Sequence, residues 1–318
     1  MIRAWIRTAL LILLVVLPGC RKTEQAGKPT IAFVMKTLNN PFFIDMQKGA
    51  ESAARELGVE LMVQAAEREV DVEKQMQIVE NLIQRRVSAI CITPSGSREI
   101  VPAIRKANDA NIPVLIVDTR VDEKVLAEAG ASTLTFIGSD NKEGGRIAGE
   151  FIVAQLGGKG NVAVLEGIPG HETGDDRLRG FHLALDQLKE MKIIASQTAN
   201  WERDQGFSVF QNILQAHPEV QALFACNDMM ALGALEAIAA AKGKHEIIVV
   251  GFDAVDDARM AIRKGDMRAS IAQNPEEMGR RAVESAYKAM KGEAVARDIP
   301  VRIELITGET LSAESKGK

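Results

Sequence analysis

The chain has 318 residues, a length that accommodates two domains of ordinary size, each with its own hydrophobic core. Its net charge is -4 and only 4% of its residues are aromatic, so the chain lacks the basic surface that nucleic-acid binding requires. We therefore expect two domains and no nucleic-acid partner.

The first 19 residues have the pattern of a secretory signal. Arg3 and Arg7 precede an uninterrupted apolar stretch at 8–17, which is too short to span a membrane stably. The following residues, Leu17-Pro18-Gly19-Cys20, resemble the lipobox of bacterial lipoproteins, in which the cysteine is acylated and becomes the mature N-terminus. We therefore expect export, a lipid anchor at Cys20 and a polar tether at 20–29.

Apolar runs of strand length alternate with amphipathic helical stretches along the rest of the chain. In the first half, strands are predicted at 31–35, 59–63, 89–92, 114–117 and 135–137, with helices that include 43–57 and 70–84. The apolar face of the 70–84 helix is predicted to contain Val72, Met76, Val79 and Ile83. This alternation is typical of an α/β fold with a parallel sheet covered on both faces.

The same alternation restarts after residue 140. Helices are predicted at 143–156, 175–188, 206–216, 229–241 and 256–264, and strands at 162–165, 193–195, 222–226, 247–250 and 269–272. A helix from 274 to about 290 and a last strand at 299–306 follow. The sequence therefore predicts two similar α/β lobes in series.

One connection, Lys36 to Phe43, carries a cation, two amides and two aromatic rings between the first strand and the first helix. Asn40-Pro41 is typical of a helix N-cap followed by proline in the first turn. Loops at the carboxyl ends of strands border the ligand crevice in open α/β sheets. The loop is therefore a candidate binding segment, although core packing is the alternative interpretation for Phe42 and Phe43.

Four further polar residues stand at the carboxyl ends of strand-like runs, namely Asp118, Asn227, Asp253 and Gln273. Each one alone is equally typical of a helix N-cap or a turn. Because all four stand at carboxyl ends of strands, they and the first loop together predict one ligand site.

These features together resemble the periplasmic sugar-binding proteins of the ribose, allose and galactose type. The resemblance covers about residues 28–306 and rests on Lys36-Thr-Leu-Asn-Asn-Pro-Phe-Phe43, Ala110-Asn-Ile-Pro-Val114, Ser139-Asp-Asn141, Asn227-Asp-Met-Met-Ala-Leu-Gly233, Val250-Gly-Phe-Asp253 and Ile271-Ala-Gln-Asn-Pro275. It implies the type I periplasmic binding protein fold, in which two doubly wound parallel-sheet lobes are joined by a three-stranded hinge. The implied lobes are 30–138 with 274–297 and 139–273 with 298–312, and the implied hinges lie near Ser139, Asn274 and Pro300.

The resemblance also implies the residues that contact the sugar. Carboxylates and amides would accept from its hydroxyl groups, a lysine and an arginine would donate to them, and aromatic rings would cover its apolar faces. The implied set is Lys36, Asn40, Phe42, Phe43, Asp118, Arg177, Trp201, Asn227, Asp253 and Gln273. Lys36 resembles the residue of allose-binding proteins, whereas the residues after Asp118, Thr119-Arg120, depart from those relatives and leave the position of Arg120 open.

Two cations, Lys36 and Arg177, and two carboxylates, Asp118 and Asp253, balance in this set, which favours a neutral monosaccharide. Such a ligand would stabilise the closed lobes, and the closed shape would be recognised by the permease of an ABC transporter. The alternative is that the protein presents a polyol or furanosyl signal to a chemoreceptor or sensor kinase. We expect a monomer in either case.

Other function classes fit less well. A glycosidase uses paired carboxylates, but the chain has no Gly-x-Ser-x-Gly, P-loop or Gly-x-Gly-x-x-Gly motif, and its four histidines stand in dissimilar contexts. A repressor would need a helix-turn-helix segment ahead of Lys28. Cys91 and Cys226 lie in strand-like runs and are predicted to be buried thiols. We therefore expect neither catalysis, nor a cofactor, nor a metal.

Overall fold

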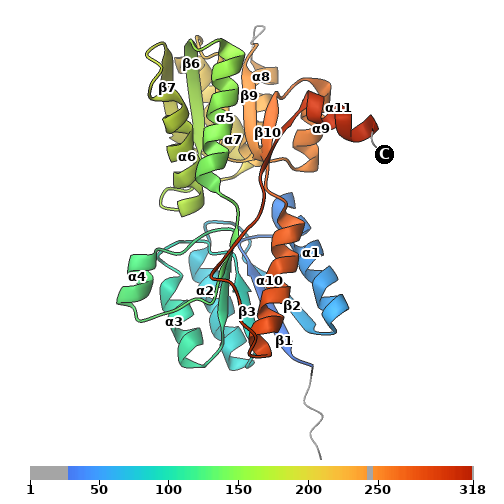
Figure 1. Ribbon diagram of the computed structural model, residues 1–318. Coiled ribbons are helices and arrows are strands. Elements are labelled where there is room, and N and C mark those ends of the chain that lie inside the picture. The colour runs from blue at the N-terminus through green and yellow to red at the C-terminus, as the bar shows by residue number, and fades with distance from the viewer. Residues whose placement is uncertain (1–27, 242–245, 317–318) are drawn as a thin grey trace, which may run out of the picture.

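The computed structural model describes residues 28–241 and 246–316. The expected signal peptide, the lipidation site Cys20 and nearly all of the tether lie outside these residues. The described chain forms two lobes, one above the other in Figure 1, and each lobe is a six-stranded sheet flanked by helices. Within the described residues, no helix combines the length and the apolar character needed to cross a membrane.

The first lobe contains the strands β1 (Thr30–Met35), β2 (Glu60–Ala65), β3 (Ala89–Ile92), β4 (Val114–Val117), β5 (Phe136–Gly138) and β11 (Asp298–Pro300). Its helices are α1 (Pro41–Leu57), α2 (Val72–Gln84), α3 (Val101–Asp109), α4 (Glu123–Glu128) and α10 (Pro275–Met290). The strand order is β11-β5-β4-β3-β1-β2 and every pairing is parallel.

The second lobe contains the strands β6 (Gly160–Glu166), β7 (Met191–Thr198), β8 (Ala222–Ala225), β9 (Ile248–Asp253), β10 (Ala269–Ala272) and β12 (Glu304–Thr307). Its helices are α5 (Asn141–Leu156), α6 (Glu172–Leu185), α7 (Arg203–Ala216), α8 (Asp228–Ala240), α9 (Asp256–Lys264) and α11 (Gly308–Lys316). The strand order is β12-β10-β9-β8-β6-β7, and only β12 is antiparallel to its neighbour.

Both sheets therefore repeat one doubly wound order, in which the second strand of the lobe lies at one edge and the first strand lies beside it. The order reverses beside β1 in one sheet and beside β6 in the other. In open sheets of this order, ligands bind outside the carboxyl ends of the strands at the point of reversal. The predicted fold class is confirmed, and the topology places a binding crevice where the two lobes meet.

The chain crosses between the lobes three times. It passes from β5 to α5 through Ser139, from β10 to α10 through Asn274, and from β11 to β12 just after Pro300. In Figure 1, α10 accordingly lies in the lower lobe beside α1. Asn274 has a positive φ of 58°, and its side chain accepts from the amide of Glu277 to cap α10.

The last crossing corrects one sequence-based prediction. A single strand was expected at 299–306 and residues 298–312 were assigned to the second lobe, but residues 298–300 pair with β5 in the first sheet. The predicted strand is one stretch of sequence, yet only its second part, β12, pairs with β10. The crossing divides this stretch into two short strands.

A second correction concerns α2. Of the predicted apolar face, Val79 is buried, whereas Val72, Met76 and Ile83 are only half-buried. The fully buried face includes Gln75, which the periodicity could not single out. The Gln75 amide donates to the carbonyl of Thr93 at 2.9 Å and accepts from the amide of Ser95 at 2.8 Å. This buried side chain thus provides hydrogen-bond partners for backbone groups of the loop after β3.

The two cysteines of the described chain, Cys91 and Cys226, are free and buried, as predicted. Burial raises the pKa of the Cys226 thiol to about 12 and also raises the pKa of Cys91. Both thiols are therefore protonated and unreactive near neutral pH.

Candidate functional site

Side chains near the carboxyl ends of strands in both sheets meet between the lobes and line a small cavity. Its volume is only about 20 Å³, room for about one water molecule, so the lining side chains of the two lobes lie close together. Every side chain that lines it is buried, with exposed fractions between 1% and 8%. The lining consists of all ten predicted residues, Lys36, Asn40, Phe42, Phe43, Asp118, Arg177, Trp201, Asn227, Asp253 and Gln273, together with Glu69 and Thr173.

The start of α1 positions the first group of these residues. Asn40 is the N-cap, as predicted, and its Oδ1 accepts from the amide of Phe42 at 3.1 Å. The Asn40 Nδ2 donates to Glu69 Oε1 at 3.2 Å, which ties the first loop to the loop after β2. Phe42 and Phe43 pack edge to face with ring centroids 5.3 Å apart, and both border the cavity as well as the core. The ligand-site and core interpretations of these rings are compatible.

Three lining residues have backbone conformations that non-glycine residues seldom adopt. Asp118, Trp201 and Asp253 have φ values of 65°, 68° and 108°. Each such conformation costs on the order of 1–3 kcal/mol and persists only where the surroundings impose it. Asp253 is the last residue of β9, and Asp118 and Trp201 lie in loops that follow strands, so part of the backbone strain of the molecule is found at the cavity.

In the first lobe, one lysine lies among two carboxyl groups. The Lys36 Nζ is 3.3 Å from Asp118 Oδ2 and 3.8 Å from Glu69 Oε2, and it lies 5.7 Å from the centroid of the Phe43 ring. Asp118 also accepts from the hydroxyl of the adjacent Thr119 at 2.9 Å. These contacts fix a donor and two acceptors on the same wall.

In the second lobe, Arg177 is held on three sides. Its Nε donates to Asn141 Oδ1 at 2.9 Å, its Nη1 donates to the carbonyl of Cys226 at 2.6 Å, and its guanidinium stacks 3.7 Å from the centroid of the Phe252 ring. Its Nη1 is 3.7 Å from Asp253 Oδ1. The guanidinium is therefore oriented before any ligand arrives, which favours directed donation to a hydroxyl group.

Burial makes two of the carboxyl groups harder to ionise. Desolvation raises the pKa of Asp253 to about 7, and the nearby Arg177 only partly offsets it. Desolvation also raises the pKa of Glu69, against the attraction of Lys36 and the hydrogen bond from Asn40. Because hydroxyl donors stabilise the ionised form, a polyhydroxylated ligand would lower both pKa values.

The acceptor Gln273 Oε1 is one of three buried side-chain polar atoms in the described chain that lack a hydrogen-bond partner. The amide nitrogen of the same side chain donates to Asp253 Oδ1 at 2.7 Å, so the oxygen is held in place at the cavity wall. An unpaired buried acceptor costs about 1–3 kcal/mol, and a ligand hydroxyl would remove that cost.

The ring of Trp201 packs against the backbone of two glycines, Gly167 and Gly174. A Cβ atom added to Gly167 would overlap its ring, and one added to Gly174 would be 3.0 Å from it. The main-chain carbonyl of Trp201 accepts from Asn227 Nδ2 at 3.0 Å. The Asn227 Oδ1 caps α8 by accepting from Met230, so this asparagine connects the ring to a helix start.

Sequence reasoning missed Glu69 and Thr173. Glu69 follows β2 and thus also stands at the carboxyl side of a strand, which was the available signal. Thr173 lies in the first turn of α6, and its hydroxyl is 2.8 Å from the hydroxyl of Thr119 in the opposite lobe. Thr119 was noted as a departure from the family pattern, and the structure places it at the seam.

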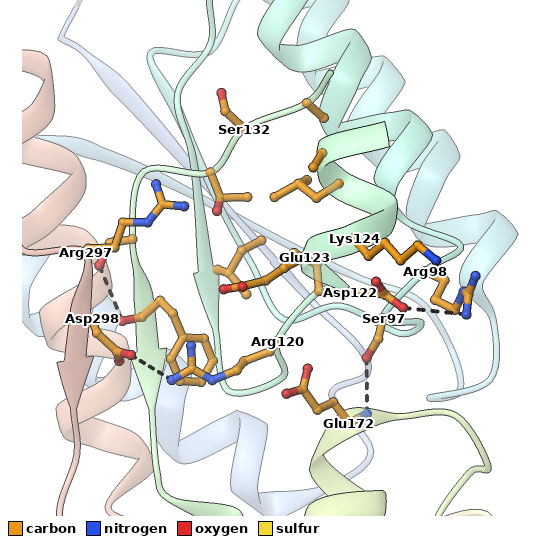
Figure 2. Close-up of a pocket in the computed structure, with 18 of the residues that line it drawn as sticks. Ser97, Arg98, Arg120, Asp122, Glu123, Lys124, Ser132, Glu172, Arg297 and Asp298 are labelled. Atoms are coloured by element: carbon orange, nitrogen blue, oxygen red, sulfur yellow. Dashed lines mark hydrogen bonds and ion pairs between the residues drawn. The ribbon is translucent and has the colours of Figure 1, made fainter. Parts of the chain in front are cut away.

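The position of Arg120 is now defined. Figure 2 shows a separate groove, in which the Arg120 Nη2 donates to Asp298 Oδ2 at 2.9 Å. The guanidinium lies 3.6 Å from the centroid of the Phe136 ring. Arg120 lines this groove and not the cavity, although it also borders a second pocket that includes Asp118 and Thr173.

Comparisons with known proteins agree with this geometry. A family model described as a periplasmic binding protein domain matches residues 31–294. The ribose import binding protein of Escherichia coli K12 is 38% identical over 300 residues, which cover 94% of this chain and 98% of that protein. The D-allose-binding periplasmic protein of the same organism is 34% identical over 286 residues, 89% of this chain and 92% of that protein.

A solved structure is similar over nearly the same length. The periplasmic solute-binding protein of an ABC transporter from Actinobacillus succinogenes, solved with bound D-allose, superposes with a TM-score of 0.85. It is 38% identical in sequence, and the match covers 90% of this chain and all of that chain. All three relatives are named as binding proteins and not as enzymes, and the names of two of them refer to import or to an ABC transporter. The chain therefore belongs to the periplasmic binding protein family and has its type I fold, with the exported location that this family implies.

Proposed function

We propose that the protein captures a neutral monosaccharide, allose-like or ribose-like, between its lobes and delivers it to the permease of an ABC importer. The observation that carries this proposal is the convergence of buried acceptors, oriented donors and aromatic rings from both lobes around one cavity. A pyranose presents hydroxyl groups that both donate and accept, and it has flat apolar faces. The twelve lining side chains match each of these features.

The charge of the cavity supports a neutral ligand. With Glu69 included, three carboxyl groups face the two cations Lys36 and Arg177. An anionic ligand would add a further negative charge to a buried site whose carboxyl groups already have raised pKa values at Glu69 and Asp253. Sugar acids and sugar phosphates should therefore bind far more weakly than neutral sugars.

Capture would proceed by closure of the lobes. The ligand contacts both lobes only when they are shut, so its affinity difference between the two states shifts the population towards the closed one. The crossings near Ser139, Asn274 and Pro300 are the segments about which the lobes would rotate. The names of the relatives favour import as the output over presentation to a chemoreceptor.

Calorimetric titration tests this proposal directly. The expected mature protein, residues 20–318 with Cys20 replaced, is titrated with allose, ribose, psicose, galactose, glucose, xylose, myo-inositol, gluconate and glucose 6-phosphate. We expect one neutral monosaccharide to bind with micromolar or tighter affinity, about -8 kcal/mol or more favourable. Binding of only an acid or a phosphate, or of no sugar at all, would contradict the proposal.

The lipid anchor at Cys20 is a separate part of the proposal, supported by the Leu17-Pro18-Gly19-Cys20 pattern. In cells that express the full chain, labelled fatty acid should be incorporated into the parent protein and not into the Cys20→Ala variant. The variant should also leave the membrane fraction. Equal labelling of the two proteins would exclude Cys20 as the acylated residue.

A further inference from the structure

His171 is buried at the seam between the lobes, although it does not line the cavity. It is the N-cap residue of α6 in the second lobe, but its side chain does not cap the helix. Instead, its Nδ1 accepts from the indole Nε1 of Trp201 at 3.4 Å. The imidazole therefore holds the edge of a ring whose face borders the cavity.

The other side of the imidazole contacts the opposite lobe. His171 is hydrogen-bonded to the backbone of Ser95, and this bond favours the protonated ring, so the backbone group is the carbonyl acceptor. The Ser95 amide is in any case occupied, because it donates to Gln75. Since Nδ1 accepts from Trp201, the donor to Ser95 is Nε2–H, and the closed arrangement requires this one neutral tautomer.

Neighbouring contacts confirm that the start of α6 is a meeting point of the lobes. The amide of Glu172 donates to Ser97 Oγ at 3.2 Å, a bond that Figure 2 shows across the seam. The hydroxyls of Thr119 and Thr173 meet 2.8 Å apart. His171 is thus a buried ionisable side chain within a set of contacts that join the two lobes.

We propose that His171 is a positioning residue, which holds Trp201 against the ligand and joins the lobes only while its imidazole is neutral. Protonation would place a proton on Nδ1, so that two N–H donors, that of the imidazolium and that of the indole, would face each other. It would also bury a charge at the seam. The proposal rests on the proposed function, since it assigns a role to Trp201 in ligand binding.

The charged groups around the imidazole do not reverse this preference. Lys36, from the first lobe, disfavours protonation, whereas Asp118, from the loop after β4, favours it. On its own helix, Glu172 and Asp175 are partly exposed carboxyl groups whose pKa values are raised by desolvation. Desolvation dominates at His171 and lowers its pKa to about 3 in the closed form.

The sign of the pH effect follows from these values. The closed form binds fewer protons at His171 than the open form, in which the ordinary pKa near 6.5 applies. The neutral imidazole of His171 therefore supports closure, and with it ligand affinity, fully above this pKa. The support is lost progressively as the pH falls below it towards the closed-form pKa of about 3. Between about pH 7.5 and about pH 5.5, the contribution of His171 weakens affinity about tenfold.

Asp253, which lines the cavity, also titrates in this range, with a pKa of about 7, and therefore adds its own pH dependence. The contribution of His171 is therefore measured as a difference between two proteins. The dissociation constant of the sugar is determined at both pH values for the parent and for His171→Gln, whose amide does not titrate. His217→Gln is the matched control, because His217 is a half-exposed histidine whose partner is Glu219.

We expect the loss of affinity on acidification to be about tenfold larger in the parent and in His217→Gln than in His171→Gln. Equal losses in all three proteins overturn the inference and leave the proposed function intact, because sugar binding at the higher pH is seen in the same titrations. If no neutral sugar binds the parent at the higher pH, the proposed function fails and this inference fails with it.

A second measurement needs no variant. Trp201 is the single tryptophan after residue 20, so the fluorescence of the mature protein reports on this ring alone. An imidazolium beside the indole quenches its fluorescence, which should fall with a midpoint near the ordinary histidine pKa of about 6.5 without sugar. Saturating sugar should move the midpoint to lower pH, and an unchanged midpoint would overturn the inference.

Discussion

The lining side chains are oriented mainly by protein contacts that would not depend on a ligand. Asn40 and Asn227 each cap a helix with one side-chain atom and hold a neighbouring site residue with the other. Arg177 is fixed by Asn141, the Cys226 carbonyl and the Phe252 ring. Donors and acceptors held in this way lose little conformational entropy on binding, which favours tight and selective recognition.

A substitution at Glu69 tests whether a carboxyl group held in this way contributes to sugar affinity. Glu69→Gln keeps an oxygen that accepts from Asn40 but removes the negative charge beside Lys36. Because hydrogen bonds to ionised groups are the stronger ones, we expect the sugar to bind about tenfold more weakly. Calorimetry of the variant checks this, with Glu67→Gln, an exposed residue of the same loop, as the control. Unchanged affinity in Glu69→Gln would exclude the carboxyl group from binding.

The site could be predicted at residues that carry a recognisable pattern. The loop Lys36–Phe43 and the residues at the ends of strands were sufficient to name eight members of the lining, and the family resemblance added Arg177 and Trp201. Glu69 lies in the loop between β2 and α2, which carries no quoted family match, and Thr173 contacts Thr119 only because the lobes close. Contacts that depend on the relative position of two lobes cannot be derived from either segment alone.

At the scale of elements, glycines let three pairs of helices touch. The pairs are α1 with α10, α5 with α6 and α7 with α8. In the first pair, Gly49 faces the backbone of Glu276 and Gly279 faces the backbone of Met46. A glycine within a helical stretch predicts only a local weakness of the helix, whereas here it permits close packing between segments far apart in sequence. The packing of α10 on α1 also fixes the crossing that follows β10.

Replacement of one such glycine should therefore be costly. A Cβ atom in Gly279→Ala would overlap the Met46 carbonyl, and overpacking of this kind costs about 1–3 kcal/mol. Denaturant unfolding should show a lower midpoint for this variant. Gly308→Ala is the control, because a Cβ atom there meets nothing within 4 Å. Equal midpoints would mean that the helices separate without strain.

At the scale of the whole molecule, two sheets with the same strand order face one cavity with the carboxyl ends of their strands. The alternating pattern was sufficient to predict the two lobes, because each lobe repeats it in one stretch of chain. The division of residues 299–306 between β11 and β12 was not predictable, since one stretch of strand-like sequence contributes to both sheets. The three crossings are the covalent links about which the lobes would close.

Closure predicts a change of overall shape. Addition of the sugar that binds in calorimetry should reduce the radius of gyration in small-angle X-ray scattering. The reason is that the seam contacts of Thr119 with Thr173 and of Ser97 with Glu172 form only when the lobes are shut. A sugar that does not bind in calorimetry serves as the control. An identical radius of gyration with and without the bound sugar would contradict capture by closure.

The most direct test of the central claim, that one sugar is held by side chains of both lobes, is calorimetry of two variants. Asp118→Ala removes an acceptor of the first lobe and Arg177→Ala removes a donor of the second, while Arg120→Ala removes an arginine that lies outside the cavity. We predict that the first two variants each lose most of the affinity for the sugar and that Arg120→Ala keeps it. Parent-like binding by both Asp118→Ala and Arg177→Ala would contradict the account.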